Sequence, residues 1–460
     1  MTSVWLVRLV PWFLRGFLPA VALLLSTGAS FAWGPHPAIT QAALDALGTN
    51  HPLKLLLGEH AQRLTNHCWL ADFKRLPFRD VDQDFYADDY LLFPGVTSHL
   101  DHICPEVRKS YAPYFRRALQ ALRTESPANA ARWIGSLLHF TEDSGSPPHA
   151  AEIRGPTHLK MENWVDAAKI HLSNYEPRNL GADDAAALEG FERRMNELID
   201  YSKPRGQRLM TQVLIGNRKA VEPVSLECAL ETSRVAADLL HTLGQLTASE
   251  KRTGGGLRGR IRTAVVPRFE RVPARIVIHG TSFSTLTDAE GRFVFRNLPP
   301  GRHELSALSP GFKTTNSFVT VALDGEVEND LTMVPGSLLR NGDFTVSWLR
   351  RDVPDCWYST PQGWEGEVIA LQPGRKYRLN VAFRPGANGD VLLRWSREVP
   401  YDLPQNVRVP RIEGKPIRPG EPEMTFTASE SMGLLQLTIR GSRPGDVCQG
   451  IQLLLENDRP

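Results

Sequence analysis

The chain has 460 residues, a length that excludes a single hydrophobic core and predicts two to four domains. Hydrophobic residues make up 42% of the chain and charged residues 23%, as in an ordinary globular protein. The formal net charge is +2, so the charge balance argues neither for nor against an anionic partner.

Residues 1–32 have the features of a secretory signal peptide. Arg8 and Arg15 supply positive charge, residues 17–26 form a short apolar segment, and residues 30–32 (Ser-Phe-Ala) form a cleavage site. An uncleaved membrane anchor is the alternative, but Arg15 leaves too few apolar residues to span a bilayer, which needs about 20. We therefore expect cleavage between Ala32 and Trp33, and a secreted or periplasmic mature protein without a transmembrane helix.

Residues 33–250 are predicted to form an all-helical domain. Apolar residues recur at intervals of three and four in several segments, which is the period of an amphipathic helix. These segments are residues 114–125, 131–140, 158–172, 185–201 and 225–246. Residues 72–105 lack this period and are predicted to form long loops. Eleven of the thirteen histidines lie before residue 250, so any chemistry that depends on histidine is expected in this domain.

Residues 139–162 contain five side chains of the types that bind zinc. They are His139, Asp143, His149, His158 and Glu162. The first two and the last two are spaced i, i+4, so each pair lies on one face of a helix. Pro147 and Pro148 are expected to end the first helix and to present the middle histidine from a loop. Two helical pairs and a loop histidine exceed the needs of one zinc ion, so we expect a site for several ions.

Two other regions contain further candidate ligands. A free α-amine has a pKa near ~7.7–8, so an amine on Trp33 can bind a metal together with the carbonyl of the same residue, and His36 is close enough in sequence to join. The alternative is that Trp33 belongs to the core and His36 to the surface. An acidic run at residues 80–89 is followed by His99 and His102. Such a run is usually a solvated loop, but a further carboxylate–histidine pair is expected only here.

Together these residues resemble the zinc-dependent phospholipase C and single-strand nuclease superfamily, all-helical enzymes with three zinc ions in one cleft. The strongest match is the pattern H-x-x-x-D-x-x-x-x-x-H followed by H-x-x-x-E, at residues 139–149 and 158–162. Mature chains of that family begin with a zinc-binding tryptophan, which corresponds to Trp33. The segments YADDY and TSH resemble the family's tyrosine-flanked aspartate and its following Ser-His, so Asp89 and His99 match. The resemblance covers about half of the chain.

The resemblance implies nine ligands around three zinc ions. One ion would be bound by Asp89, His99, His139 and Asp143. A second would be bound by the amine and carbonyl of Trp33, by His36, and by Asp143 as a bridge. The third would be bound by His149, His158 and Glu162. Nitrogen and oxygen ligands without cysteine suit catalytic zinc.

The resemblance also implies roles in catalysis. Clustered zinc ions bind a phosphodiester and lower the pKa of a bound water toward about 7. Asp89 would orient or deprotonate this water. Asp84 and Asp88 compete for its position, and Asp72 resembles a W-A-D segment of the nuclease branch. Tyr90 would line the headgroup pocket, with plain core packing as an equal alternative.

Beyond a glycine-rich linker at residues 249–257, the hydrophobic period changes to two, which predicts β-strands. Residues 257–335 are predicted to form a small antiparallel β-sandwich. They resemble the carboxypeptidase regulatory-like domain through T-D-x-x-G-x-F, L-P-P-G and P-G-F motifs, which implies a spacer or adhesion module. A basic stretch at residues 251–275 is better interpreted as a solvated strand face than as an anion-binding patch.

Residues 336–460 are predicted to form a jelly-roll or carbohydrate-module-like β-sandwich. Its tryptophans are Trp348, Trp357, Trp364 and Trp395. We expect them in the core, since tryptophan is highly buried on average, although exposed ones would suit carbohydrate or cell-surface contact. Of the five cysteines, Cys356 and Cys448 are the favoured disulfide pair. Cys68 with Cys104 is possible, which would leave Cys228 free, and the sequence does not fix the pairing.

The sequence thus predicts a multidomain protein, with an all-α catalytic domain followed by two all-β sandwich domains. The predicted function is a secreted zinc-dependent phosphodiesterase of the phospholipase C type, acting on phospholipid or another phosphodiester. The alternatives are a single-strand nuclease or nucleotidase of the same superfamily, and a non-catalytic zinc-binding adhesion protein.

Overall fold

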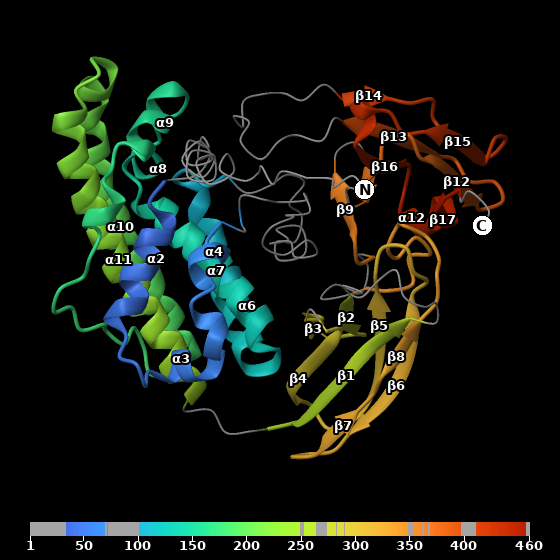
Figure 1. Ribbon diagram of the computed structural model, residues 1–460, viewed down its shortest axis with the longest axis horizontal. Coiled ribbons are helices and arrows are strands. Elements are labelled where there is room, and N and C mark those ends of the chain that lie inside the picture. Colours follow the sequence, from blue (N-terminus) through green and yellow to red (C-terminus); the bar gives the residue numbers. More distant parts are fainter. Residues whose placement is uncertain are drawn as a thin grey trace, which may run out of the picture.

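The fold is that of a computed structural model (Figure 1). It describes residues 34–69, 71, 101–248, 253–263, 274–281, 283–288, 290–347, 354–360, 363–366, 369–396 and 411–456. Helices make up the N-terminal half of this part and β-sheets the C-terminal half, so the predicted fold class is confirmed. The signal-peptide segment lies outside the described residues, and none of the helices within them is long and apolar enough to cross a membrane.

The N-terminal half is a bundle of helices in which two long helices form a hairpin (Figure 1). Its α-helices are α2 (His36–Ala46), α3 (Pro52–Leu57), α4 (Leu64–His67), α6 (Tyr111–Thr124), α7 (Pro127–Gly145), α8 (Pro147–Ala150), α9 (Pro156–Asn163), α10 (Asp184–Leu214) and α11 (Arg218–Ala248). Short 3-10 helices are η1 (Gly58–Ala61), η3 (Glu106–Ser110) and η4 (Ala167–Lys169). Four of the five predicted helices are confirmed, within α6, α7, α10 and α11.

The fifth helix, predicted over residues 158–172, is wrong beyond Asn163, where α9 ends. The backbone leaves the helical conformation at Trp164, which has φ −97° and ψ 57°. Asp166 then caps the start of η4, where its carboxylate accepts a hydrogen bond from the backbone amide of Ala168 at 3.2 Å. The chain continues into η4 and then without a regular helix, so α9 has only about two turns.

Helix α7 lies at the centre of the bundle and positions the site. Ser126 caps its start by accepting a hydrogen bond from the amide of Asn129, and Pro127 occupies the first turn, where a missing N–H costs nothing. From Asn129 onward every side chain of α7 is buried, because α4, α6, α10 and α11 pack around it. The helix ends at Gly145, and Ser146 and two prolines follow, as predicted; α8 begins at the first of these prolines.

The first β-domain is a sandwich of two four-stranded sheets. One sheet contains β1 (Gly255–Thr263), β4 (Arg292–Leu298), β7 (Glu326–Glu328) and β8 (Leu331–Met333), and the other contains β2 (Arg275–Ile278), β3 (Ser284–Leu286), β5 (Gly301–Leu308) and β6 (Thr315–Val321). The prediction that this sandwich is purely antiparallel is wrong, since β7 and β8 pair in parallel with β1. The chain reaches them only after crossing to the other sheet, so no hairpin forces an antiparallel pairing.

The basic stretch in this domain is a solvated strand face, as predicted, over the residues that the structure describes. Arg258 and Arg262 point outward from β1 and pair with Glu328 and Asp330. Arg275 differs, because it is largely buried and its Nε lies 2.9 Å from the Asp355 carboxylate of the next domain.

The C-terminal domain is a second sandwich. Its larger sheet contains β9 (Trp357–Thr360), β10 (Gly363–Gly366), β11 (Ile369–Ala370), β13 (Asp390–Ser396), β14 (Arg411–Glu413) and β16 (Leu434–Arg440). Its smaller sheet contains β12 (Lys376–Phe383), β15 (Glu423–Thr427) and β17 (Cys448–Leu455), and short helices η5 (Glu430–Met432) and α12 (Pro444–Val447) lie in its loops. Trp357 and Trp395 are buried in the core, as expected, whereas Trp364 is partly exposed and Trp348 lies outside the described residues.

The favoured disulfide between Cys356 and Cys448 is wrong, because all five cysteines are free and buried. Cys448 begins β17 in the smaller sheet, whereas Cys356 precedes β9 at the edge of the larger one, so the two residues belong to different layers of the sandwich. Burial raises the pKa of the Cys448 thiol to about 12, which keeps it protonated and unreactive at neutral pH.

Candidate metal centre

Six of the predicted ligands lie together in two groups at one end of the helix bundle. The first group is His36, His139 and Asp143, and the second is His149, His158 and Glu162. Within each group the candidate ligand atoms all lie within 4.8 Å of one another. Every one of these side chains is buried except that of His158, which is partly exposed.

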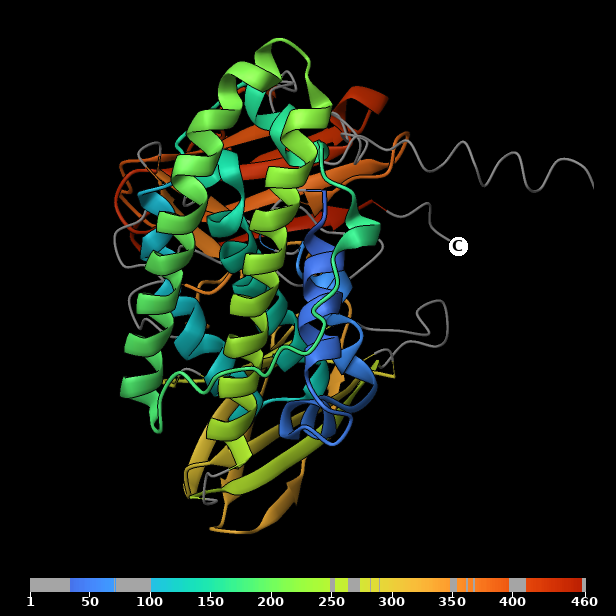
Figure 2. The same ribbon diagram turned by 90° about the vertical axis from the view of Figure 1, so that its left-hand side faces the viewer.

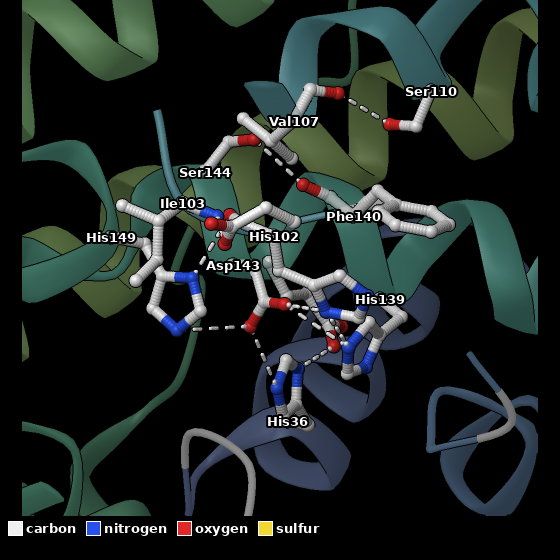
Figure 3. A network of polar contacts seen from close by, with 12 residues as sticks. His36, His102, Ile103, Val107, Ser110, His139, Phe140, Asp143, Ser144 and His149 are labelled. Carbon is white, nitrogen blue, oxygen red and sulfur yellow. Dashed lines mark hydrogen bonds and ion pairs between the residues drawn. The ribbon is translucent and has the colours of Figure 1, made fainter. Parts of the chain in front are cut away.

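Asp143 is the centre of the first group (Figure 3). Its Oδ2 lies 3.0 Å from Nε2 of His139, one turn earlier on α7, as the i, i+4 spacing predicts. Its Oδ1 lies 3.3 Å from Nε2 of His36 in the first turn of α2. The two carboxylate oxygens therefore face two different histidines, so Asp143 is placed to bridge two ligand sets.

The second group joins α8 to α9. His149 lies in α8 and not in the predicted loop, and its Nε2 is 2.8 Å from Oε1 of Glu162. The same oxygen lies 3.1 Å from Nε2 of His158, again one helical turn away. Nε2 of His149 is also 3.7 Å from Oδ1 of Asp143, so the two groups are contiguous.

His102 completes the first group, although the ligand assignment from the sequence used His99 instead. Its Nδ1 lies 2.8 Å from Oδ2 of Asp143 and 2.9 Å from Nε2 of His139 (Figure 3). The residue precedes η3 in a segment without helical period, so only its presence after the acidic run pointed to it. His99 itself lies outside the described residues and stays a prediction.

Three histidines are oriented by the backbone in the same way. Nδ1 of His139 is 2.7 Å from the Cys68 carbonyl, that of His149 is 3.0 Å from the His102 carbonyl, and that of His158 is 2.8 Å from the Ile153 carbonyl. A carbonyl can only accept, so each Nδ1 donates, and each Nε2 is left facing the carboxylates. This nitrogen donates to a carboxylate when it carries a proton and can bind a metal ion when it does not. Metal-binding histidines are typically held this way.

His36 is oriented by a buried carboxylate that the sequence did not single out. Its Nδ1 donates to Oε2 of Glu142 at 2.5 Å, and Oε1 of Glu142 accepts a hydrogen bond from the Thr40 hydroxyl at 2.6 Å. All three side chains are fully buried. Burial raises the pKa of Glu142 and outweighs the opposing contacts with His36 and Thr40. The pattern is a carboxylate–histidine pair aimed at the cluster.

The charges of the cluster favour a bound cation. Burial opposes ionisation of Asp143, but the neighbouring His139 and His149 and hydrogen bonds from His102 and His139 hold its pKa well below the usual range. Burial likewise opposes the charge on His149, but Asp143 and Glu162 raise its pKa to about 9. Without metal, a proton on His149 therefore faces the carboxylates of Asp143 and Glu162. A divalent ion can replace this proton, since metal binding releases it.

The donor set fits zinc. Nε2 nitrogens and carboxylate oxygens are its usual ligands at catalytic sites. Among the described residues, no group donates a hydrogen bond to Oε2 of Glu162, although this oxygen is buried. Buried acceptors of this kind need a partner, and a bound cation supplies one.

The other predicted site residues lie outside the described residues. These are Trp33, Asp89, Tyr90 and His99, with the competing Asp72, Asp84 and Asp88. Gly34 is described, and it lies close to the end of α9. A methyl group on its Cα would be 3.4 Å from Oδ1 of Asn163 and 3.7 Å from the carbonyl oxygen of Glu162. The chain that follows Trp33 therefore passes beside the second group.

Comparisons with known proteins give a partial match. Residues 270–334 match the family model of the carboxypeptidase regulatory-like domain. No curated protein matches the chain. Similar solved structures include the α-toxin of an avian strain of Clostridium perfringens, with 12% identity, a TM-score of 0.34, and coverage of 63% of this chain and 93% of that one.

The α-toxin of Clostridium absonum has 15% identity and a TM-score of 0.32, and covers 66% of this chain and 96% of its own. A mutant cohesin–X-dockerin complex of Acetivibrio cellulolyticus has 20% identity and a TM-score of 0.18, and covers 20% of this chain and 67% of its own. These TM-scores are too low to support a conclusion about activity.

Proposed function

We propose that this chain is a secreted zinc-dependent phosphodiester hydrolase of the phospholipase C type. The observation that carries the proposal is the pair of contiguous histidine–carboxylate groups, with Asp143 between them. A carboxylate shared between two ligand sets is suited to hold two ions a few ångströms apart, which is the arrangement used in phosphoryl transfer. The sequence pattern at residues 139–162 supports the same assignment independently.

The ligands would be assigned to three zinc ions in the following way. His139, Asp143 and His102 would hold one ion, and His36, with the amine and carbonyl of Trp33 and with Asp143, would hold a second. His149, His158 and Glu162 would hold the third. Bound zinc supplies Lewis acidity and lowers the pKa of a coordinated water.

The remaining roles are proposed from the sequence pattern. Asp89 would orient or deprotonate the attacking water, and would share the first ion with His99 or with His102. Tyr90 would contact the headgroup of the substrate. If Asp89→Asn kept full turnover with zinc bound, the proposed role of Asp89 would be wrong.

Zinc stoichiometry and hydrolysis together test the proposal. We expect three zinc ions per mature chain by elemental analysis, and chelator-sensitive hydrolysis of phosphatidylcholine or of a chromogenic phosphodiester. Hydrolysis of single-stranded DNA but not of phospholipid would favour a nuclease. Zinc-replete protein that cleaves neither would leave the non-catalytic adhesion protein, for which the match of residues 270–334 to a regulatory-like domain is the supporting observation.

The assignment of Trp33 has a separate test. Residues added before Trp33 abolish the free α-amine, so an N-terminally extended chain is expected to lose one of the three ions. The matched control is the same extension followed by a protease site and removed after purification. Full zinc content in the extended chain would contradict the assignment.

A further inference from the structure

The apex of the α10–α11 hairpin (residues 208–219) exposes an unusual amount of apolar surface close to the metal centre. Eight large hydrophobic residues are exposed in the described part of the chain, and four of them lie on α9 or at the end of α10. They are Leu159, Met210, Leu214 and Ile215. Leu214 and Ile215 are the most exposed of the four, at 67% and 69%.

The hairpin apex is convex and lies at the tip of the molecule. In Figure 2 the turn between the two long helices projects beyond every other element in that direction, and in Figure 1 α9 lies beside the same end. Gly216 makes the turn tight by adopting φ +74°. A protruding apolar tip cannot enclose a small ligand, but it can insert into a lipid bilayer.

The backbone of the hairpin apex is already satisfied by its own hydrogen bonds. The amides of Ile215, Gly216 and Asn217 donate to the carbonyls of Thr211, Val213 and Gln212, at 3.2, 3.2 and 2.8 Å. Backbone groups that enter a bilayer must be paired internally, because lipid tails offer no partner. The turn meets that condition for these three amides without any rearrangement.

The charge around the hairpin apex is positive. Residues 204–221 contain four basic residues and no acidic residue. Arg208, Arg218 and Lys219 are exposed beside the apolar side chains, and on α9 Lys160 is exposed next to Leu159. A cationic rim around an apolar tip is complementary to a membrane surface that contains anionic phospholipid.

A small hydrophobic cluster connects the hairpin apex to the zinc ligands. It consists of Ile153, Met161, Leu209, Val213 and Val221. Met161 lies between His158 and Glu162 in α9, so the helix that carries two ligands packs directly on the base of the apex. An apex inserted in a bilayer would therefore hold the second ligand group next to the headgroup layer.

We propose that the hairpin apex, together with Leu159, docks the chain on an anionic phospholipid bilayer. The proposal rests on the proposed function for its purpose, which is to bring the metal centre to phospholipid. Its evidence is the exposure, shape, internal hydrogen bonding and charge of the apex.

Co-sedimentation with vesicles in the cold tests the docking of the zinc-loaded mature chain, which begins at Trp33. The vesicles consist of phosphatidylcholine, with or without one third of phosphatidylglycerol. Leu214→Asn combined with Ile215→Asn is expected to weaken binding at least tenfold, since two apolar side chains no longer enter the bilayer. The matched control is Leu55→Asn combined with Leu323→Asn, at remote positions exposed to 68% and 58%, and it should bind as the unmodified chain does. Equal binding by the apex variant and the unmodified chain would overturn the proposal.

A second variant separates lipid insertion from simple charge attraction. Arg218→Gln combined with Lys219→Gln is expected to reduce binding only to vesicles with phosphatidylglycerol. If this charge variant lost binding to vesicles while the Leu214→Asn and Ile215→Asn variant still bound them, the surface would bind polyanions in general, and the lipid proposal would be wrong.

The docking and the proposed function can fail separately, because vesicle binding requires no turnover. A chain that binds vesicles through the apex but hydrolyses no phosphodiester would support the docking and contradict the proposed function. A chain that hydrolyses a soluble phosphodiester but binds neither kind of vesicle would support the proposed function and contradict the docking.

Discussion

Glu142 is the single residue whose role is clearest from its contacts alone. It is next to Asp143 in sequence, and its Oε2 accepts a hydrogen bond from Nδ1 of His36 at 2.5 Å, whereas Nε2 of the same histidine faces Asp143. Glu142→Gln removes the negative charge and offers an amide where a carboxylate oxygen stood. We expect zinc affinity to fall about 10-fold to 100-fold, as for other partners of metal-binding histidines. Titration with a competing chelator measures the affinity directly.

The matched control for Glu142 is Thr40→Val. It removes only the hydroxyl that donates to Oε1 of Glu142, at 2.6 Å, and leaves the carboxylate and His36 in place. We expect it to lower zinc affinity less than Glu142→Gln does. A folded Glu142→Gln variant with unchanged affinity would show that Glu142 is only a structural residue.

A pair of histidines away from the metal centre makes stability depend on pH. Nε2 of His51 lies 3.0 Å from Nδ1 of His241, and Nδ1 of His51 accepts a hydrogen bond from the Leu53 amide at the start of α3. Burial, with smaller repulsions from His241 and Lys54, lowers the pKa of His51 to about 4, and burial also lowers that of His241.

The direction of the pH effect follows from these shifts. The folded pKa of His51 is below its unfolded value of about 6.5, so its contribution is complete above pH ~6.5 and is lost as pH falls toward 4. Because His51 is only partly buried, we expect a loss of only about 1 kcal/mol. Urea unfolding at pH 7 and pH 5 measures the free energy of unfolding. Between these two pH values, His51→Asn should lose less of it than the unmodified protein does, since asparagine still caps α3 but does not titrate. The control is His171→Asn, at an exposed site. An equal loss of stability in the unmodified protein, in His51→Asn and in His171→Asn would contradict this prediction.

The individual ligands differ in how far the sequence could predict them. The pairs His139–Asp143 and His158–Glu162 are local, so helical spacing was enough to place each pair on one face. The contact of His102 with Asp143 spans 41 positions and that of His36 with Glu142 spans 106. No local pattern encodes contacts of that range. They arise when α2 and the segment before η3 pack on α7.

At the scale of helices, close packing of α10 on α8 holds His149 in place. A methyl group on Gly206 of α10 would lie 2.2 Å from the Pro147 carbonyl oxygen and 2.9 Å from Cβ of Ala151. Gly206→Ala would gain up to about 1 kcal/mol in helix propensity. The clash is with backbone, which no side-chain rotation relieves, so we expect net destabilisation of about 1–3 kcal/mol. Chemical denaturation measures it.

The displacement of α8 should also be visible in the metal centre. Because α8 carries His149, Gly206→Ala is expected to lower the occupancy of one of the three proposed zinc ions and to leave the other two bound, as measured by elemental analysis. Gly48→Ala is the matched control, since a methyl group there has no neighbour within 4 Å in the described structure. The prediction fails if both variants keep full zinc content and stability.

The helices and strands were predictable where a local period or a proline determined them. Ser126 and Pro127 at one end of α7 and the prolines after Ser146 mark both of its ends in the sequence. An apolar period does not reveal that α9 ends at Asn163 and that a separate 3-10 helix, capped by Asp166, follows it. The parallel pairing of β7 and β8 with β1 depends on how the chain crosses between sheets, so alternation could predict the strands but not their direction.

At the scale of the whole molecule, a chain of buried charges connects all three domains. Arg117 of α6 pairs with Glu125 at 2.5 Å and stacks on Trp133, and both charged side chains are almost fully buried. The backbone of Glu125 bridges to Phe295 of β4. Burial raises the pKa of Glu125, and the positive charge of Arg275 of β2 is among the charges that oppose this shift. Nε of Arg275 lies 2.9 Å from Oδ2 of Asp355 in the C-terminal domain. The helical domain and both sandwiches therefore share one electrostatic contact region.

Removal of one charge from this region should loosen the connection between domains. Glu125→Ala leaves Arg117 buried without its carboxylate partner, and breaking a buried pair in this way costs about 3–5 kcal/mol. The matched control is Asp184→Ala. It removes the exposed carboxylate at the start of α10 that pairs with Arg123 of α6, and it should cost under about 1 kcal/mol. Calorimetry is expected to show lower stability for Glu125→Ala, with the helical domain unfolding before the sandwiches. A single, unshifted transition would mean that water enters the contact region and that the domains are held together by apolar packing instead.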